Sequence, residues 1–500
     1  MKKLCLLVAA ILLPSIANAE LKLPNIFGDH MVVQQKLPIV IWGKTRPGQS
    51  VTAEVGSSTG KTEADNEGNF RMSLPALEAG GGPLTLTVTA DETKTFTDVL
   101  VGEVWICSGQ SNMQWSVNAA NDADLERLAA KHPNLRMINF PQVGTQEPIW
   151  SHDRQWQVCT PETVGGFSAV GYFFGRQLLD TLDVPVGMIN NAWGGSACEA
   201  WVNRDVLSAD PQFQPLLDRW AQNEDAFAKL SERTDLNENE TKQLANLKRL
   251  MAGNARPGNI YNGVLKSHLG YGIKGAIWYQ GESNASRAYQ YRELFPAMIS
   301  NWRDEWGQGD FPFYWVQLAD FRDEKAEPVE SDWAELREAQ TMTMAKLPNT
   351  GEAVIIDIGE GKDIHPKNKV DVGHRLARWA LARDYGISVP YRSPQYKSMK
   401  KDGGKITMSF EFVDGNGWRP FDVRNPVGFA IAGDDKKFVW ADATILQDGR
   451  IEVSSKEVAD PVAVRYAWAD NPVCNMYDNA GLPLTPFRTD DWPGVTINNK

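Results

Sequence analysis

The pattern of hydrophobic and polar residues changes twice along the chain. From 20 to 98, short apolar or alternating runs are separated by Gly, Pro, Asn and Asp, which predicts a small β-sandwich-like module. Between 99 and 390, apolar runs alternate with stretches of helical periodicity, as in a parallel sheet covered by helices. From 391 to 500 the β-type runs return. The pattern therefore predicts an α/β domain flanked by two β modules.

The central region contains five apolar runs that are typical of strands buried on both faces. These expected strands are 100–107, 186–192, 275–279, 313–318 and 353–358. Four amphipathic stretches between and after them predict helices that cover both faces of the sheet: 169–182, 287–306, 332–347 and 367–385. A more polar stretch at about 205–258 predicts a helical insertion.

The first 19 residues form a separate unit. An apolar run, 4–16, follows Lys2 and Lys3 and precedes Ala17-Asn18-Ala19. It is too short to cross a hydrocarbon layer of about 30 Å. This pattern is that of a signal peptide, so we expect a secreted or periplasmic protein without a stable membrane anchor.

Charge and cysteine content exclude several classes of function. The net charge of −12 becomes −14 when the two lysines of residues 1–19 are removed. Without a basic run, nucleic-acid binding is not expected. The cysteines at 107, 159, 198 and 474 match no zinc or CxxC spacing, and they form either disulfides or free thiols. The six histidines are scattered, so no metal or other cofactor is expected.

Four of the five expected strands are followed by loops with reactive or hydrogen-bonding side chains. In open parallel sheets, ligands bind outside the carboxyl ends of the strands. The loops are 108–113 (SGQSNM), 193–196 (WGGS), 280–284 (QGESN) and 363–366 (DIHP). Together they hold a hydroxyl, an imidazole, amides and carboxylates, which is a set suited to acyl transfer.

Ser111 is the candidate nucleophile, because Gly109 permits a tight turn that presents its hydroxyl. A serine needs a base, and His365 alone among the histidines lies in a loop after an expected parallel strand. Pro366 is a suitable first residue for a helix that holds the imidazole. The sequence therefore predicts a Ser111–His365 pair.

Two further roles have several candidates. Oxyanion donors are the backbone N–H groups of Ser111 and of Gly194 or Gly195, with a side-chain amide from Gln280 or Asn284. The acid that orients the imidazole is Asp363, Glu282 or, less strongly, Asp357. The spacing from Asp363 to His365 places both side chains on one face of an extended backbone.

These loops, in this order, resemble those of the SGNH hydrolase superfamily, and in detail those of the sialate O-acetylesterase and acetylxylan-esterase-like carbohydrate esterases. The resemblance implies a flavodoxin-like, parallel five-stranded sheet. It also implies Ser111 as nucleophile, His365 as base, and a Gly of the 194–195 pair with Gln280 as oxyanion donors. The superfamily commonly has Asp three residues before His, where this chain has Lys362. Related esterases with a Gln-Gly-Glu block use that Glu, which keeps Glu282 as an alternative to Asp363.

The expected function is that of a metal-free serine esterase that removes O-acetyl groups from a carbohydrate, either sialic acid or another glycan. Residues around the loops are expected to bind the substrate: Asn112, Trp193, Glu199 and Asn284. One alternative is a glycoside hydrolase that uses Glu282 and Glu199 as a carboxylate pair. Another alternative is a glycan-binding protein without catalysis.

Overall fold

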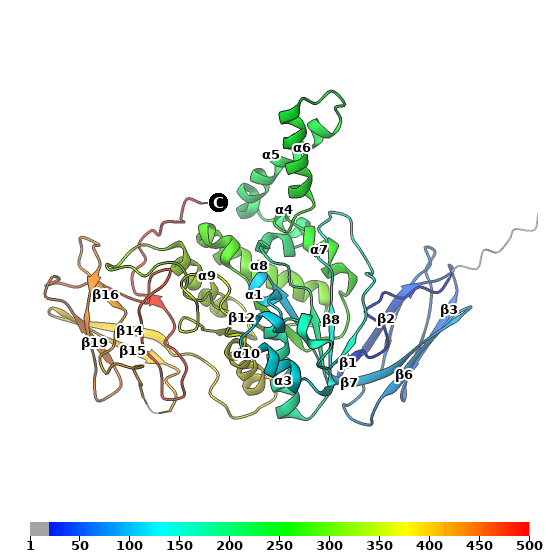
Figure 1. The fold of residues 1–500 in the computed structure, drawn as a ribbon, viewed down its shortest axis with the longest axis horizontal. Coiled ribbons are helices and arrows are strands. Elements are labelled where there is room, and N and C mark those ends of the chain that lie inside the picture. The colour runs from blue at the N-terminus through cyan, green and yellow to red at the C-terminus, as the bar shows by residue number, and fades with distance from the viewer. Residues whose placement is uncertain (1–19, 416, 500) are drawn as a thin grey trace, which may run out of the picture.

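A computed structural model describes residues 20–415 and 417–499, so the expected signal peptide lies outside the described residues. A central α/β domain lies between an N-terminal and a C-terminal β module (Figure 1). Within the described residues, no helix is both long enough and apolar enough to cross a membrane. All four described cysteines are free thiols.

The central sheet has the strand order β13-β12-β11-β7-β10-β8-β9. Its strands are β7 (Thr93–Gly109), β8 (His132–Asn139), β9 (Gln157–Cys159), β10 (Val186–Asn190), β11 (Gly275–Tyr279), β12 (Phe313–Val316) and β13 (Thr350–Ala353). All neighbours are parallel except β9, which runs antiparallel to β8. The five expected strands are present in the order second-first-third-fourth-fifth, which is the order of flavodoxin-like sheets.

The prediction of a five-stranded parallel sheet is wrong in its strand number and in its uniform direction. The structure adds the parallel strand β8 and the antiparallel strand β9 at one edge. The first residues of β8 are His132, Pro133 and Asn134, which are typical of a loop, and its buried part spans only four residues. The fifth strand also lies earlier than expected, because β13 ends at Ala353 and the apolar residues after it are buried without belonging to a strand.

Helices cover both faces of the sheet. On β7, Trp105 and Cys107 belong to the same buried cluster as α3 (Ala169–Leu182) and α10 (Lys369–Arg383). The alternate residues Val104 and Ile106 belong to the cluster of α8 (Ala288–Trp306) and α9 (Asp332–Lys346). Because successive side chains of a strand point to opposite faces, the two helix pairs lie on opposite sides of the sheet. The short helices α2 (Ala123–Ala129) and α7 (Asn259–Gly263) belong to connections between the strands.

The N-terminal module is joined to the central sheet by one continuous strand. The first part of β7 pairs with β6 (Leu84–Thr89), and its second part pairs with β10 and β11. The boundary expected at residue 98 therefore falls inside β7. The other strands of this module are β1 (Val32–Gln34), β2 (Ile39–Lys44), β3 (Ser50–Val55), β4 (Ser58–Glu63) and β5 (Asn69–Leu74).

The C-terminal module consists of two four-stranded antiparallel sheets with a shared apolar core. One sheet contains β14 (Gln395–Asp402), β15 (Lys405–Glu411), β19 (Ile451–Ser454) and β18 (Asp442–Ile445). The other contains β17 (Val439–Trp440), β16 (Phe429–Ala432), β20 (Ala463–Tyr466) and β21 (Phe487–Arg488).

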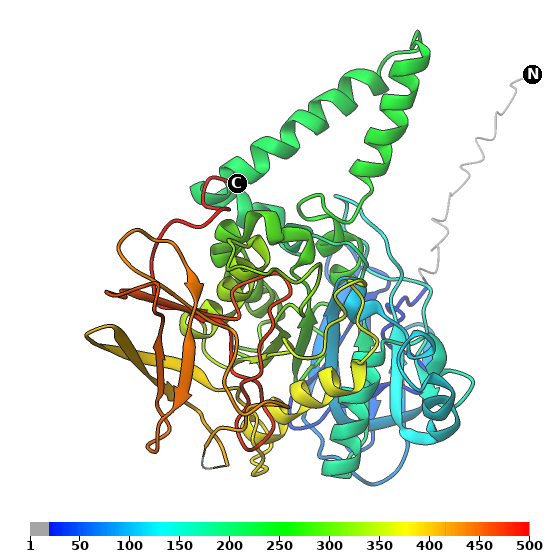
Figure 2. The ribbon, with the colours of Figure 1, turned by 60° about the vertical axis from the view of Figure 1, so that its left-hand side comes forward.

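The insertion is helical and projects from the body of the protein (Figures 1 and 2). It contains α4 (Arg204–Ala209), α5 (Gln214–Ser231) and α6 (Glu238–Met251). The turn between the two long helices ends in a capping box, in which Asn237 and Glu240 each bond the other's backbone N–H. This local sequence explains why α6 begins at residue 238.

Candidate active site

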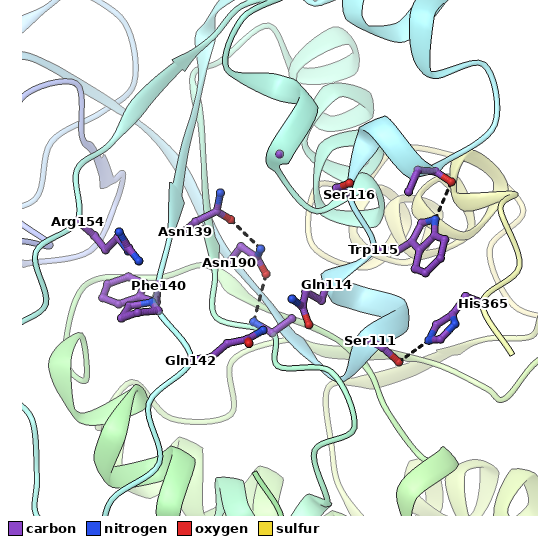
Figure 3. Close-up of a pocket in the computed structure, with 14 residues that line it drawn as sticks. Ser111, Gln114, Trp115, Ser116, Asn139, Phe140, Gln142, Arg154, Asn190 and His365 are labelled. Carbon is purple, nitrogen blue, oxygen red and sulfur yellow. Dashed lines mark hydrogen bonds between the residues drawn. The ribbon is translucent and has the colours of Figure 1, made fainter. Parts of the chain in front are cut away.

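Ser111 and His365 meet at the carboxyl edge of the central sheet. Ser111 begins the short helix α1 (Ser111–Gln114) directly after β7. The turn requires glycine at 109, where φ is +127° and a Cβ would lie 2.2 Å from the carbonyl oxygen of Tyr279. The Nε2 atom of His365 lies 2.9 Å from the Oγ atom of Ser111 (Figure 3). The two loops thus place a hydroxyl within hydrogen-bond distance of an imidazole.

An indole holds the imidazole on one face. The rings of Trp115 and His365 are stacked, with centroids 4.8 Å apart and an interplanar angle of 13°. Trp115 itself is fixed, because its Nε1 donates to the carbonyl oxygen of Ala119 at 2.8 Å. The expected helix start at Pro366 is wrong: α10 begins at Lys369, since the side chain of Asn368 caps it. His365 is therefore held by stacking and loop contacts, ahead of the helix.

Of the three candidate acids, Asp363 contacts the imidazole. Its Oδ1 lies 3.5 Å from Nδ1 of His365 and accepts the backbone N–H of His365 at 2.9 Å. Asp357 forms two hydrogen bonds of 2.6 Å with the guanidinium of Arg375. Glu282 accepts a hydrogen bond from Asn112 at 2.7 Å. The second and third candidates are thus engaged by other groups.

Burial keeps the imidazole in its neutral form. Desolvation lowers the pKa of His365 below its ordinary value, and the positive charge of Lys369 acts in the same direction. The carboxylate of Asp363 opposes both effects. Because desolvation is the largest of these contributions, His365 carries a free lone pair at neutral pH and can accept a proton.

The expected oxyanion donors differ in availability. The backbone N–H of Gly194 donates to Oε1 of the exposed Gln114 at 2.7 Å, and a Cβ at 194 would lie 3.3 Å from Cβ of Ser111. Gly195 is exposed and has a φ of +72°. These positions leave Gly194 as the glycine beside the nucleophile.

The structure does not support Gln280 as an oxyanion donor. Its side chain is fully buried, and its Nε2 donates to the carbonyl oxygen of Ser196 at 3.1 Å and to Oδ1 of Asn284 at 2.7 Å. Its Oε1 accepts from the hydroxyl of Tyr291. With both amide hydrogens engaged, Gln280 braces the loop below the site.

Most of the residues expected to bind substrate lie below the site. Asn112, Glu199 and Asn284 are each 1% exposed. Asn284 donates to Glu199 at 2.9 Å, and Glu199 also lies 3.6 Å from Arg287. Trp193 is half-buried and packs against the apolar core. These side chains contact other groups of the protein, because the loops pack against one another. The sequence had suggested that they line an open surface.

A pocket of about 800 Å³ opens beside the Ser111–His365 pair. Figure 3 shows Gln114 and Asn190 between this pair and Arg154. The lining residues are Ser111, Gln114, Trp115, Ser116, Ala119, Asn139, Phe140, Pro141, Gln142, Arg154, Gly166, Asn190, Ala192 and His365. The sequence did not indicate the part of this wall formed by Asn139, Phe140, Pro141 and Gln142, because Asn139 ends the unexpected strand β8 and the other three follow it. The described residues include no group of three or more His, Cys, Asp or Glu that could hold a metal ion.

Comparison with known proteins identifies the family of this chain. The family model described as "Carbohydrate esterase, sialic acid-specific acetylesterase" matches residues 101–231 and 251–382. The sialate O-acetylesterase of Mus musculus is 28% identical over 92% of each chain, and that of Rattus norvegicus is 30% identical, also over 92% of each.

A solved structure, described as a novel carbohydrate acetylesterase from Xanthomonas citri, is also similar. It is 38% identical and superposes with a TM-score of 0.81, covering 95% of this chain and 100% of its own. The family match spans the four loops that carry Ser111, Gly194, Glu282 and His365. The chain therefore belongs to the sialic acid-specific acetylesterase family of carbohydrate esterases, and it is a carbohydrate acetylesterase.

Proposed function

We propose that the enzyme removes O-acetyl groups from a sugar through an acetyl-serine intermediate. The observation that supports this most strongly is the 2.9 Å contact between Oγ of Ser111 and Nε2 of His365 at the wall of the pocket. The alternative of a glycoside hydrolase has less support, because Glu282 and Glu199 do not line this pocket and each accepts a hydrogen bond from a neighbouring Asn side chain. A carboxylate pair that cleaves a glycosidic bond must face the substrate from both sides.

In the proposed reaction, His365 accepts the hydroxyl proton as Oγ of Ser111 attacks the acetyl carbonyl. The tetrahedral intermediate collapses when the bond to the sugar oxygen breaks, and His365 delivers its proton to that oxygen. Water then attacks the acetyl-serine, again with His365 as base, and acetate leaves. Asp363 orients the imidazole and stabilises its protonated form, because its carboxylate lies on the Nδ1 side of the ring.

The oxyanion is proposed to bind to the backbone N–H groups of Ser111 and Gly194. In the structure, the N–H of Gly194 is held by the side-chain oxygen of Gln114 at 2.7 Å. Gln114 is exposed, so it can move aside when a carbonyl oxygen takes the same donor. A donor of this type contributes on the order of 3 kcal/mol to the stability of the transition state.

O-acetylated sialic acid is the proposed substrate, rather than a neutral acetylated glycan. Among the described residues, the pocket wall includes no Asp or Glu, although the sequence has 63 of them. It includes Arg154, and a guanidinium pairs well with the carboxylate of an acidic sugar. Asn139, Gln142 and Asn190 add amides that can bind sugar hydroxyls or an N-acyl group.

The catalytic proposal is tested with Ser111→Ala, assayed for acetate release from O-acetylated sialic acid and from p-nitrophenyl acetate. We expect a loss of activity of about 1,000-fold or more with both substrates. Ser208→Ala is the matched control, since Ser208 is exposed on α4, and it should keep full activity. Full turnover by Ser111→Ala would contradict the proposal.

The choice of substrate is tested with Arg154→Gln. A lost charge-assisted contact of about 1.5–3 kcal/mol predicts a drop of about tenfold or more in kcat/KM for O-acetylated sialic acid. The value for an acetylated xylo-oligosaccharide should not change. Arg127→Gln, at an exposed position on α2, is the control. An equal loss with both substrates, or no loss with either, would contradict the role of Arg154.

A further inference from the structure

A cluster of polar side chains lies directly below Ser111 and joins three of the loops at the sheet edge; Lys369 and Asn112 are buried and Glu282 is half-buried. Nζ of Lys369, the first residue of α10, donates to Oδ1 of Asn112 at 2.5 Å. Nδ2 of Asn112 donates to Oε1 of Glu282 at 2.7 Å. It also donates to the carbonyl oxygen of Ile364 at 2.9 Å. The amide of Asn112 therefore connects a cation, a carboxylate and the backbone of the residue before His365.

Placing these charges inside the protein is costly. Lys369 is fully buried and Asn112 is 1% exposed, while Oε2 of Glu282 is buried with no hydrogen-bond partner among the described residues. Two aromatic rings face the ammonium group, with Nζ 5.3 Å from the centroid of Tyr279 and 5.9 Å from that of Trp115. An unpaired buried charge costs several kcal/mol, and apolar residues of the same size would commonly pack with less penalty. A cluster of this kind at the active site therefore calls for a functional explanation.

The contacts indicate what the cluster controls. Asn112 follows the nucleophile in the chain, and Ile364 precedes the base. A hydrogen bond between them fixes the distance between the two loops that carry Ser111 and His365. The lysine and the glutamate polarise the amide from both ends, which strengthens its bonds and restricts its rotation. Trp115 adds a second connection, because it lies under the ammonium group and stacks on His365.

Building on the proposed acetyl-serine mechanism, we propose that Lys369 and Glu282 are positioning residues that act through Asn112 to hold the imidazole of His365 against Ser111. In this account Glu282 supports the reaction from below, and Asp363 orients the ring directly. The cluster affects the chemical step more than binding of the sugar, because none of its three side chains lines the pocket.

The charge of Lys369 gives this proposal a distinctive pH signature. The titratable groups that face its ammonium are Glu282, Glu360, Asp363, His365 and the phenol of Tyr279. Burial lowers the pKa of Lys369 to about 7, against the opposing effect of the three carboxylates. Its positive charge in turn lowers the pKa of His365. Removing this charge should raise the pKa of His365, so that activity is lost at a higher pH as the solution is acidified.

The test is Lys369→Met, which keeps the length of the side chain and removes its charge and its hydrogen bond. We expect kcat for O-acetylated sialic acid to fall by about 10- to 100-fold, as a misplaced reacting group predicts, with KM within about threefold of the wild-type value. The acidic limb of the profile of kcat/KM against pH should move to higher pH. Lys367→Met removes an exposed charge two residues away, and it should leave both readouts unchanged.

Asn112→Asp provides a second test if Lys369→Met does not fold. It keeps an acceptor oxygen for Lys369 but removes the amide donor to Ile364 and places a carboxylate against Glu282. A loss in kcat of similar size, again with little change in KM, is expected. Wild-type kcat and an unchanged pH profile in either folded variant would overturn the proposal.

Ser111→Ala is measured in the same assay to separate the two proposals. If Ser111→Ala is inactive while Lys369→Met behaves like the wild type, only the positioning role fails. If Ser111→Ala retains full turnover, the acetyl-serine mechanism fails, and the positioning role fails with it.

Discussion

The side chains on the two sides of the Ser111–His365 pair differ in how exposed they are to solvent. On the open side, the pocket presents side chains such as Gln114 and Arg154 that are exposed and able to rearrange around a ligand. On the closed side, Asn112 and Lys369 are buried and their hydrogen bonds are made within the protein. In the proposed mechanism, the side chains that select the substrate and those that align the reacting groups therefore lie on opposite sides of this pair. Changes on the closed side should alter kcat, and those on the open side should alter the choice of substrate.

The largest expected effect distinguishes the two carboxylates nearest to the Ser111–His365 pair, those of Asp363 and Glu282. Asp363→Asn should lower kcat by about 1,000-fold or more, because the orienting charge is lost. Glu282→Gln should lower it by less than about tenfold, since a Gln oxygen still accepts the hydrogen bond from Asn112. Steady-state kinetics of both variants, with thermal unfolding as a check on folding, make this comparison. The reverse order of effects would identify Glu282 as the acid of the triad.

A smaller effect is expected at the oxyanion donor. In Gly194→Ala the new Cβ would lie 2.9 Å from Oε1 of Gln114, which can move aside, and 3.3 Å from Cβ of Ser111, so the loop must give by a few tenths of an ångström beside the nucleophile. We expect kcat to fall by about 100-fold. In Gly195→Ala the strain of a positive φ should cost about 1–2 kcal/mol of stability, with a much smaller loss of rate. If the two variants lose activity in the opposite order, Gly195 is the donor.

Loss of the ring that stacks on the base should have a moderate effect. Trp115→Leu removes a stacking contact worth about 0.5–1.5 kcal/mol, which predicts a decrease in kcat of about 3- to 10-fold. Because Trp115 also lines the pocket, KM should rise with sialic acid esters and stay constant with p-nitrophenyl acetate. Unchanged kcat with both substrates would show that the ring does not hold the imidazole.

The smallest effect is a shift in the pH profile of the unmodified enzyme. His365 must be neutral to accept the proton of Ser111, and burial lowers its pKa below the ordinary 6.5. Activity should therefore be retained below pH 6.5 and be lost only as the pH falls through the lowered pKa. A midpoint above 6.5 in kcat/KM for p-nitrophenyl acetate would show that the charge of Asp363 outweighs burial.

Sequence reasoning was most successful where local pattern decides the structure. The strand 275–279 and the helix 169–182 have the expected bounds, because apolar runs and amphipathic periodicity are local signals. The placement of Ser111 beside His365 followed from strand-end loops of one parallel sheet. The strand β8 was missed because its first residues are polar and include proline.

The buried polar contacts could not be predicted from local sequence patterns. Gln280 was expected to donate to the oxyanion, but its amide donates to Ser196 and Asn284. These contacts depend on how the loops pack against one another. Lys369 has the pattern of an ordinary solvent-exposed lysine at a helix start, yet it is fully buried. No periodicity marks such a residue, since its burial depends on contacts distant in the chain. The sequence therefore left the orienting acid open among Asp363, Glu282 and Asp357, and of these only Asp363 lies against the imidazole in the described residues.

In the proposed mechanism, Ser111 carries the acetyl group during turnover. The most direct measurement is rapid acid quenching of the enzyme with p-nitrophenyl acetate in the first turnovers, followed by mass spectrometry of the proteolytic peptides. An acetyl-serine intermediate would add one acetyl group to the peptide that contains Ser111, and none to that peptide in Ser111→Ala. An active enzyme whose acetyl group appears on another residue, or that releases acetate without any acetylated peptide, would contradict it.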